Sequence, residues 1–290
     1  MVLDGGYRGS RSDKEQIEEY LLSIESEEFD RIGRNYIDAN RSTNFIFIMD
    51  EEVSTEIKRR FNEILGAMPT SPSDDFSNYF LTGHYFNRSE KEQNLRVNKV
   101  ERDIIYPTWN SELEIIEHKA SHEVIKNIIK ILYDENLIIV RSHSLRVAKT
   151  IIRSIFPDYY NEIRVIRFSD EDKINIIASL AILRGANIRF EGDDEIQSAI
   201  FSAGQSERNE ALKNLKNSLR FQNAREGGEI RICKFSHPRN PELDVSNLKS
   251  KDVVTFGINF TQGKVYFFNF LDELETREWI LNILSYINLN

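Results

Sequence analysis

The chain has 290 residues, and its 40% hydrophobic and 11% aromatic content is enough to bury a sizeable core. Its formal net charge of -9 argues against a general nucleic-acid-binding protein, because such proteins usually carry an excess of Lys and Arg. No apolar run approaches the roughly 18 residues that span a bilayer, and the first residues lack a signal-peptide pattern. We therefore expect a globular cytoplasmic protein with no membrane partner.

The first predicted elements alternate helix and strand. Ser12 followed by Glu15 has the spacing of a capping box and predicts an acidic amphipathic helix. The apolar run at 45–49 predicts a buried strand, and the periodic apolar positions after it predict a second amphipathic helix. Residues 66–78 are rich in Pro, Ser and Asp, which predicts an exposed loop. Strand-like stretches follow this loop.

The middle of the chain contains an internal repeat. Residues 115–132 align with residues 138–155 at an offset of 23, and the alignment matches isoleucines, a serine and cations in the two copies. Each copy predicts a short strand, a polar turn with the serine near a helix N-cap, and an amphipathic helix with its cations on one face. A third, weaker unit begins with a predicted strand at 163–168.

The last third of the chain has a different pattern. Residues 194–221 have leucines at helical spacing with cations one position later, which predicts a basic helix. The stretch 253–270 alternates aromatic and polar residues around a turn and predicts a hairpin, and 274–287 predicts a closing helix. The one cysteine, Cys233, cannot form an internal disulfide, and we expect it to be buried and inert.

Together these elements predict an α/β or α+β fold. We expect a mixed sheet covered by amphipathic helices, with βα repeat units and a C-terminal β-hairpin plus helix. The chain divides into three regions: an acidic α/β segment and loop at 1–78, a central βα-repeat region at 79–192, and a C-terminal region at 193–290 with the basic helix, the hairpin and the closing helix.

The charges are segregated along the chain. Residues 119–153 contain seven cations and three acids, and residues 208–239 contain eight cations and three acids. Cationic rows at helical spacing suit contacts with a phosphate backbone. Our leading hypothesis is therefore an intracellular nucleic-acid-associated binding protein that uses basic helix faces and has no catalysis of its own. The candidate contacts are Lys126, Lys130, Arg141, Arg146, Lys149, Arg153, Lys213, Lys216 and Arg220.

The stretch RDIIYPTWNSELEIIEHKA resembles the core of the PD-(D/E)xK nuclease family, with Asp103 in one apolar run and Glu117-x-Lys119 at the end of the next. The resemblance implies that the two acids bind Mg²⁺ and that Lys119 positions or activates the attacking water. An ordinary pair of strands is the open alternative. The repeat favours it, because Val140 and Ser142 take the positions of Glu117 and Lys119 in the second copy.

A third hypothesis is a protein-interaction subunit or a homo-oligomeric scaffold. The hairpin stretch has more large apolar groups than one sheet face needs, and such groups mark an interface when they are exposed. They are Phe256, Phe260, Tyr266, Phe267, Phe268 and Phe270. The sequence has no Gly-rich phosphate loop or nucleophile elbow, so we expect no cofactor and no metal, except Mg²⁺ under the nuclease hypothesis.

Overall fold

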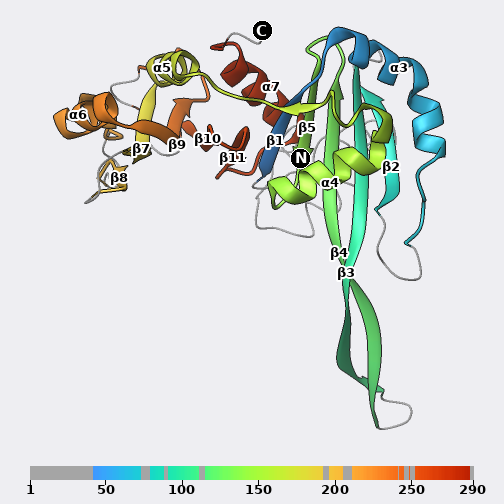
Figure 1. Cartoon of the computed structure of the whole chain (residues 1–290). Coiled ribbons are helices and arrows are strands. Elements are labelled where there is room, and N and C mark those ends of the chain that lie inside the picture. The colour runs from blue at the N-terminus through green and yellow to red at the C-terminus, as the bar shows by residue number, and fades with distance from the viewer. Residues whose placement is uncertain are drawn as a thin grey trace. The chain divides into compact units, whose positions relative to one another are not determined.

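The structure is a computed structural model of the chain (Figure 1). It describes residues 42–72, 79–87, 91–110, 115–191, 196–204, 211–240, 242–244, 248 and 252–287. Within these ranges only the backbone is described at 85–87, 101–110 and 115–123. The acidic helix expected after Ser12 lies outside the described residues.

The chain forms two compact units, which we call the N-terminal and the C-terminal unit. The N-terminal unit comprises Thr43–Arg167 with the short segment Asn259–Val265, and the C-terminal unit comprises Phe168–Ile258 and Tyr266–Asn290. Each is built on antiparallel strand pairs with helices, so the expectation of a mixed α/β class holds at this coarse level. The division into three regions stays a prediction.

The N-terminal unit is a sheet covered by two helices. Its strand order is β2-β3-β4-β5-β1, β6 pairs with β1, and these pairings are all antiparallel. Figure 1 shows α3 and α4 packed along the strands. The elements are β1 (Thr43–Ile48), α3 (Glu51–Gly66), β2 (Phe80–Asn87), β3 (Glu92–Asn110), β4 (Ile115–Leu132), β5 (Leu137–Arg141), α4 (Leu145–Ile155), the 3-10 turn η1 (Pro157–Tyr159) and β6 (Arg164–Val165).

The first copy of the repeat does not have the predicted strand-turn-helix structure. Residues 115–132 form one continuous strand, β4, because the part expected to be helical pairs with β3 on one side and with β5 on the other. This part is rich in β-branched residues, which fit a strand better than a helix. A turn follows β4, in which Asn136 has a positive φ of 55°, and the chain returns as β5.

The second copy is a strand followed by a helix. Ser144 begins α4, and its hydroxyl accepts a hydrogen bond from the Val147 N–H at 3.2 Å, which satisfies a donor that the first helical turn leaves free. The buried face of α4 packs with the inner side chains of α3 and of the sheet in one core. Its buried residues are Ala148, Ile151, Ile152 and Ile155.

β3 and β4 continue as a two-stranded ribbon beyond the rest of the sheet. β2 pairs with β3 only as far as Asn98, and β5 pairs with β4 only from Ile128. The β3–β4 ladder runs on until Asn110 lies opposite Ile115, and Figure 1 shows the ribbon projecting from the helix-covered sheet. Residues 102–110 and 115–120, the described parts of the nuclease-like stretch, belong to this ribbon.

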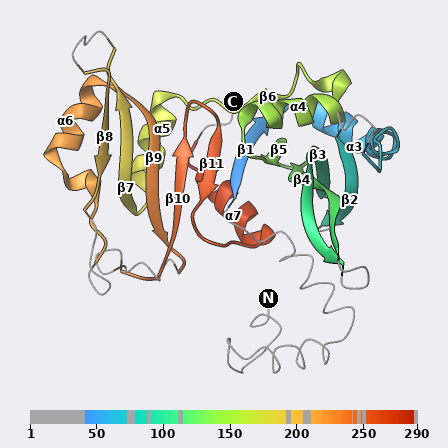
Figure 2. The same cartoon turned by 90° about the horizontal axis from the view of Figure 1, so that it is seen from below.

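The C-terminal unit is also built on a sheet with helices. Its strands follow the order β11-β10-β9-β7-β8, and Figure 2 shows them side by side in this order. β7 is antiparallel to both β8 and β9. The elements are α5 (Asp170–Ser179), β7 (Ile182–Arg189), β8 (Ser198–Ser202), the 3-10 turn η2 (Leu215–Asn217), α6 (Leu219–Gly227), β9 (Glu229–Pro238), β10 (Val253–Asn259), β11 (Lys264–Phe267) and α7 (Glu273–Leu284).

The prediction of a basic helix at 194–221 is wrong. The described residues of this stretch contain the edge strand β8, an irregular segment with η2, and only the start of α6. Asn214 fixes the irregular segment, because its Oδ1 accepts from the N–H groups of Leu183 and Lys216, both at 3.1 Å. The strand predicted at 163–168 is also shorter than expected, since only Arg164–Val165 pair with β1.

Three of the six aromatic side chains expected to mark an interface are buried, and Tyr266 is half-buried. Phe256, Phe260 and Phe267 are buried, whereas Phe268 and Phe270 remain 39% and 67% exposed. Cys233 is buried in β9, and burial raises the pKa of its thiol. Among the helices that the structure describes, none has the length and apolar character needed to cross a membrane.

Candidate nucleic-acid interface

The outer face of α4 carries three exposed cations. Arg146, Lys149 and Arg153 lie at i, i+3 and i+7, so they form a row on the side of the helix away from the core. The helix LRVAKTIIRSI contains no acid. Its apolar residues hold it on the sheet, and its cations therefore face solvent.

These cations remain available to a ligand. Among the described residues, Arg146 and Lys149 form no ion pair. The Arg153 guanidinium lies 5.6 Å from the centroid of the Tyr160 ring. An aromatic face attracts a cation without cancelling its charge. The row can therefore still bind an anion.

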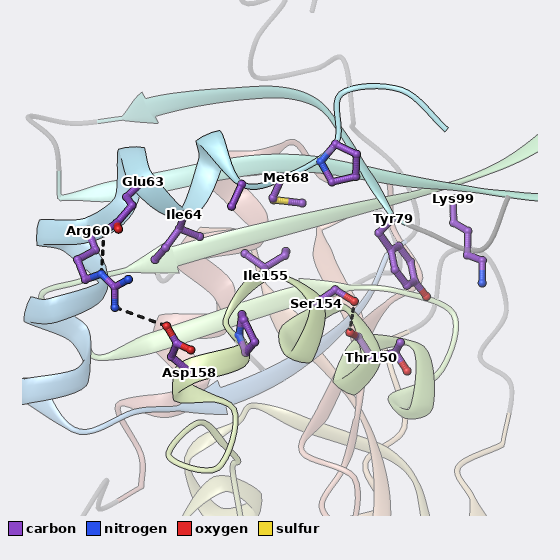
Figure 3. A pocket seen from close by; sticks show the side chains of 13 residues that line it. Arg60, Glu63, Ile64, Met68, Tyr79, Lys99, Thr150, Ser154, Ile155 and Asp158 are labelled. Atoms are coloured by element: carbon purple, nitrogen blue, oxygen red, sulfur yellow. Dashed lines mark hydrogen bonds and ion pairs between the residues drawn. The ribbon is translucent and has the colours of Figure 1, made fainter. Parts of the chain in front are cut away.

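A groove of about 570 Å³ runs between α3 and α4 (Figure 3). Arg60 lies at one end and is neutralised there, because it pairs with Glu63 at 2.8 Å and with Asp158 at 3.5 Å. A hydrogen bond from Arg60 to Glu63 is the main cause that raises the pKa of Arg60. Tyr79 and Lys99 lie at the other end of the groove.

Lys99 is the cation that the groove offers to a ligand. Its Nζ lies 5.5 Å from the centroid of the Tyr79 ring, and it forms no ion pair with any described residue. Tyr79 is 9% exposed, and burial raises the pKa of its hydroxyl. At the Arg60 end the two acids outnumber the arginine, so the groove is acidic there and cationic at the Lys99 end. On α4, Lys149 and Arg153 directly precede the groove-lining Thr150 and Ser154, but the cations of the row do not themselves line the groove.

Lys126 and Lys130 do not join the α4 row. Both lie on strand β4, so they do not form a helical row. Ile129 and Ile131 belong to the core under α3 and α4, and side chains alternate along a strand, so Lys126 and Lys130 point to the opposite face. Lys126 is exposed there, but Lys130 is only 4% exposed.

Lys130 has a structural ion pair. Its Nζ lies 3.2 Å from Oε1 of Glu92, whose side chain is 1% exposed. A lysine held in this way cannot reach the phosphates of a bound strand. Arg141, at the end of β5, is half-buried.

The predicted secondary patch lies in the C-terminal unit and is not a helical row. Lys213 precedes η2, Lys216 lies within η2, and Arg220 lies in α6. The Lys216 ammonium donates to the carbonyl oxygens of Ala178, at 3.0 Å, and Leu180 at the end of α5. Burial lowers the pKa of Lys216, and only Lys213 and Arg220 remain exposed.

The β3–β4 register separates the positions of the nuclease-like motif. Asp103 lies opposite His122, whereas Glu117 lies opposite Thr108. The two acids are thus five residues apart along the ladder, about 16 Å at the rise of a strand. Directly opposite residues share a face and successive residues alternate, so positions 103 and 117 fall on opposite faces of the ribbon.

One metal ion requires ligand oxygens about 2.0 to 2.6 Å away, so this register does not bring Asp103 and Glu117 to a common ion. Lys119, two residues after Glu117, lies opposite Tyr106 and takes the same face as position 117. The side chains of all three residues lie outside the described part.

No sequence pattern pointed to Tyr79, Lys99 or Asn127 as site residues. Tyr79 directly precedes β2, Lys99 lies in β3 and Asn127 lies in β4, and only the fold brings them beside α4. They are far apart in the sequence, and no short motif connects them. No family model matches the sequence, and no curated protein matches it.

Proposed function

We propose that the chain is a nucleic-acid-binding protein whose contact surface is the α4 row with the Lys99 end of the groove, and that it has no catalysis of its own. One observation carries the proposal: α4 presents Arg146, Lys149 and Arg153 to solvent on an acid-free helix. Three neighbouring cations suit contacts with phosphates. We also propose that the protein acts in the cytoplasm.

The net charge of -9 limits the kind of binding. A protein with excess negative charge repels nucleic acid over most of its surface, so the approach is restricted to a local cationic patch. Phosphate contacts fix position and carry no sequence information. We therefore expect binding that depends strongly on salt and weakly on sequence.

The test is a binding titration of the full chain with labelled duplex and single-stranded oligonucleotides over a salt series. The variant Arg146→Glu, Lys149→Glu, Arg153→Glu is expected to lose tenfold or more in affinity at low salt. Its log-log salt slope should also become shallower by about 0.7 to 0.9 for each phosphate that the variant no longer neutralises. A retained circular dichroism spectrum and melting temperature would show that α4 is intact.

The matched control reverses three exposed cations of the C-terminal unit: Lys213→Glu, Arg220→Glu, Arg225→Glu. It changes the net charge by the same amount, so a loss confined to the α4 variant separates local contact from general charge. The proposal fails if the wild type does not bind at low salt, or if both variants bind equally well.

A further inference from the structure

A second, smaller cavity adjoins the Lys99 end of the groove. It measures about 200 Å³ and shares Tyr79 and Lys99 with the groove, so the two are neighbours. Pockets for drug-sized ligands measure roughly 300 to 1,000 Å³, so this cavity suits a group of the size of one planar ring. The described residues that line it are Tyr79, Lys99, Ile125, Asn127, His143 and Val147.

Asn127 is the unexplained group of this cavity. The residue is 1% exposed, and its Nδ2 donates to the Ile125 carbonyl oxygen at a long 3.4 Å. Its Oδ1 is buried and accepts no hydrogen bond from any described residue. Buried polar atoms are nearly always hydrogen-bonded, because an unmade bond is costly. An acceptor left open beside a cavity indicates a ligand that brings a donor.

The strand register explains why Asn127 faces this cavity. Asn127 lies opposite Val97, and Ile125 lies opposite Lys99. Val97 belongs to the core between the sheet and the helices α3 and α4. Directly opposite residues share a face, so Asn127 lies on the helix-covered face of the sheet, and Ile125 and Lys99 lie on the same face. The core therefore stops at Asn127, and the amide occupies the boundary between packed isoleucines and the open cavity.

Two other residues that line the cavity suit the ring and the phosphate of a nucleotide. The Tyr79 ring offers a flat apolar surface, and Lys99 offers a positive charge. None of the described residues that line the cavity is an acid. Stacking on an aromatic ring and a cation for the backbone are the usual contacts of a single-stranded nucleic acid.

We propose that this cavity is the subsite for one unpaired nucleobase with an exocyclic amine. The base belongs to a single-stranded nucleic acid whose phosphates are bound by the α4 row. The inference rests on the proposed function. The Asn127 Oδ1 accepts a hydrogen bond from the amine, Tyr79 packs against the base, and Lys99 binds an adjacent phosphate. The base must be unpaired, because the edges and faces of a base inside a duplex are already occupied by pairing and stacking.

Oligo(dC) and oligo(dT) of equal length provide the direct test, because cytosine has an amine where thymine has a carbonyl oxygen. The wild-type chain is expected to bind oligo(dC) about 3- to 10-fold more tightly than oligo(dT), the effect of one hydrogen bond to a buried acceptor. Asn127→Leu, which keeps the size of the side chain, is expected to abolish this preference and to leave the salt slope unchanged.

The matched control is Asn98→Leu on β3. Asn98 lies opposite Lys126, on the face of the ladder away from this cavity, and its Nδ2 donates to the Thr82 hydroxyl at 3.2 Å. This variant should keep the preference for oligo(dC). Asn127→Leu should also unfold at the same or a higher urea concentration than the wild type, because it removes an unsatisfied buried acceptor.

The outcomes separate the two proposals. Equal binding of oligo(dC) and oligo(dT), with a salt slope that still depends on the α4 row, would overturn the base subsite alone. A duplex bound as tightly as oligo(dC) would overturn it too, because the bases of a duplex are paired and stacked. Absence of binding to every oligonucleotide at low salt would overturn both proposals.

Discussion

Residues 115–132 and 138–155 match in sequence and differ in structure. The first segment is the single strand β4, and the second is β5, a Ser144-capped start, and α4. The reason lies in their neighbours: β4 has strand partners on both sides, whereas the chain after β5 lies over the sheet and packs its apolar stripe on the core. Matching apolar residues thus do not fix the kind of element, and the available packing partners decide it.

The cations of the two segments differ for the same reason. Lys130 and Arg153 occupy equivalent places in the alignment, yet Lys130 is buried with Glu92 and Arg153 is exposed over Tyr160. A charge inside a sheet needs an ion-pair partner, whereas a charge on the outer face of a helix is free to bind a ligand. Three measurements can sharpen this comparison or contradict it.

The largest effect is expected from Lys130→Ala. The substitution removes the ammonium that lies 3.2 Å from the buried Glu92 carboxylate, so we expect a loss of about 3 to 5 kcal/mol in the free energy of unfolding. Arg153→Ala, at the equivalent position, should change it by less than about 0.5 kcal/mol, because its side chain is exposed. Urea unfolding of both variants measures the contrast. Equal losses would show that the two cations have similar surroundings.

A smaller effect is expected from Ser144→Ala. The change removes the hydroxyl that accepts from the Val147 N–H, and the loss of a helix cap costs about 1 kcal/mol. Ser121 is the equivalent residue of the first segment, and position 121 lies within β4, where there is no helix to cap. Ser121→Ala should therefore leave the free energy of unfolding almost unchanged. A loss of about 1 kcal/mol in both variants would mean that the first segment also contains a capped helix.

The smallest effect concerns a partly buried histidine, His237. Like Lys130, it is a titratable group in the interior, and its protonation should make the free energy of unfolding depend on pH. Burial, and next the charge of Lys216, lower the pKa of His237, whose Nδ1 accepts from the Ala181 N–H at 3.1 Å. Below pH 6.5 or so the unfolded chain binds a proton that the folded chain rejects, so the free energy of unfolding should fall as the pH drops through this range.

His237→Asn tests this contribution, because an amide oxygen can accept from Ala181 without binding a proton. The variant and the wild type should have similar pH dependence above about pH 7. Below about pH 6.5 the wild type should lose slightly more stability than the variant in urea titrations. Parallel curves over the whole range would show that His237 does not contribute.

Local signals in the sequence were sufficient for several elements. The apolar run at 45–49 overlaps β1, and the periodic positions after it include Ile57 and Phe61, which are buried in α3. Ser144 marks the start of α4, and the spacing of Arg146, Lys149 and Arg153 places them on one side of it. Each of these features depends on residues within one or two helical turns, so the sequence by itself determines it.

Pairing and position in the sheet decided the rest. The β-branched run of 122–132 is compatible with a helix until β3 and β5 bind its two edges, and the register then separates Asp103 from Glu117 by five residues of ladder. The same packing buries Lys130 and joins Tyr79, Lys99 and Asn127 beside α4. These relations connect residues far apart in the chain, and their free energy comes from contacts that exist only after the sheet has formed.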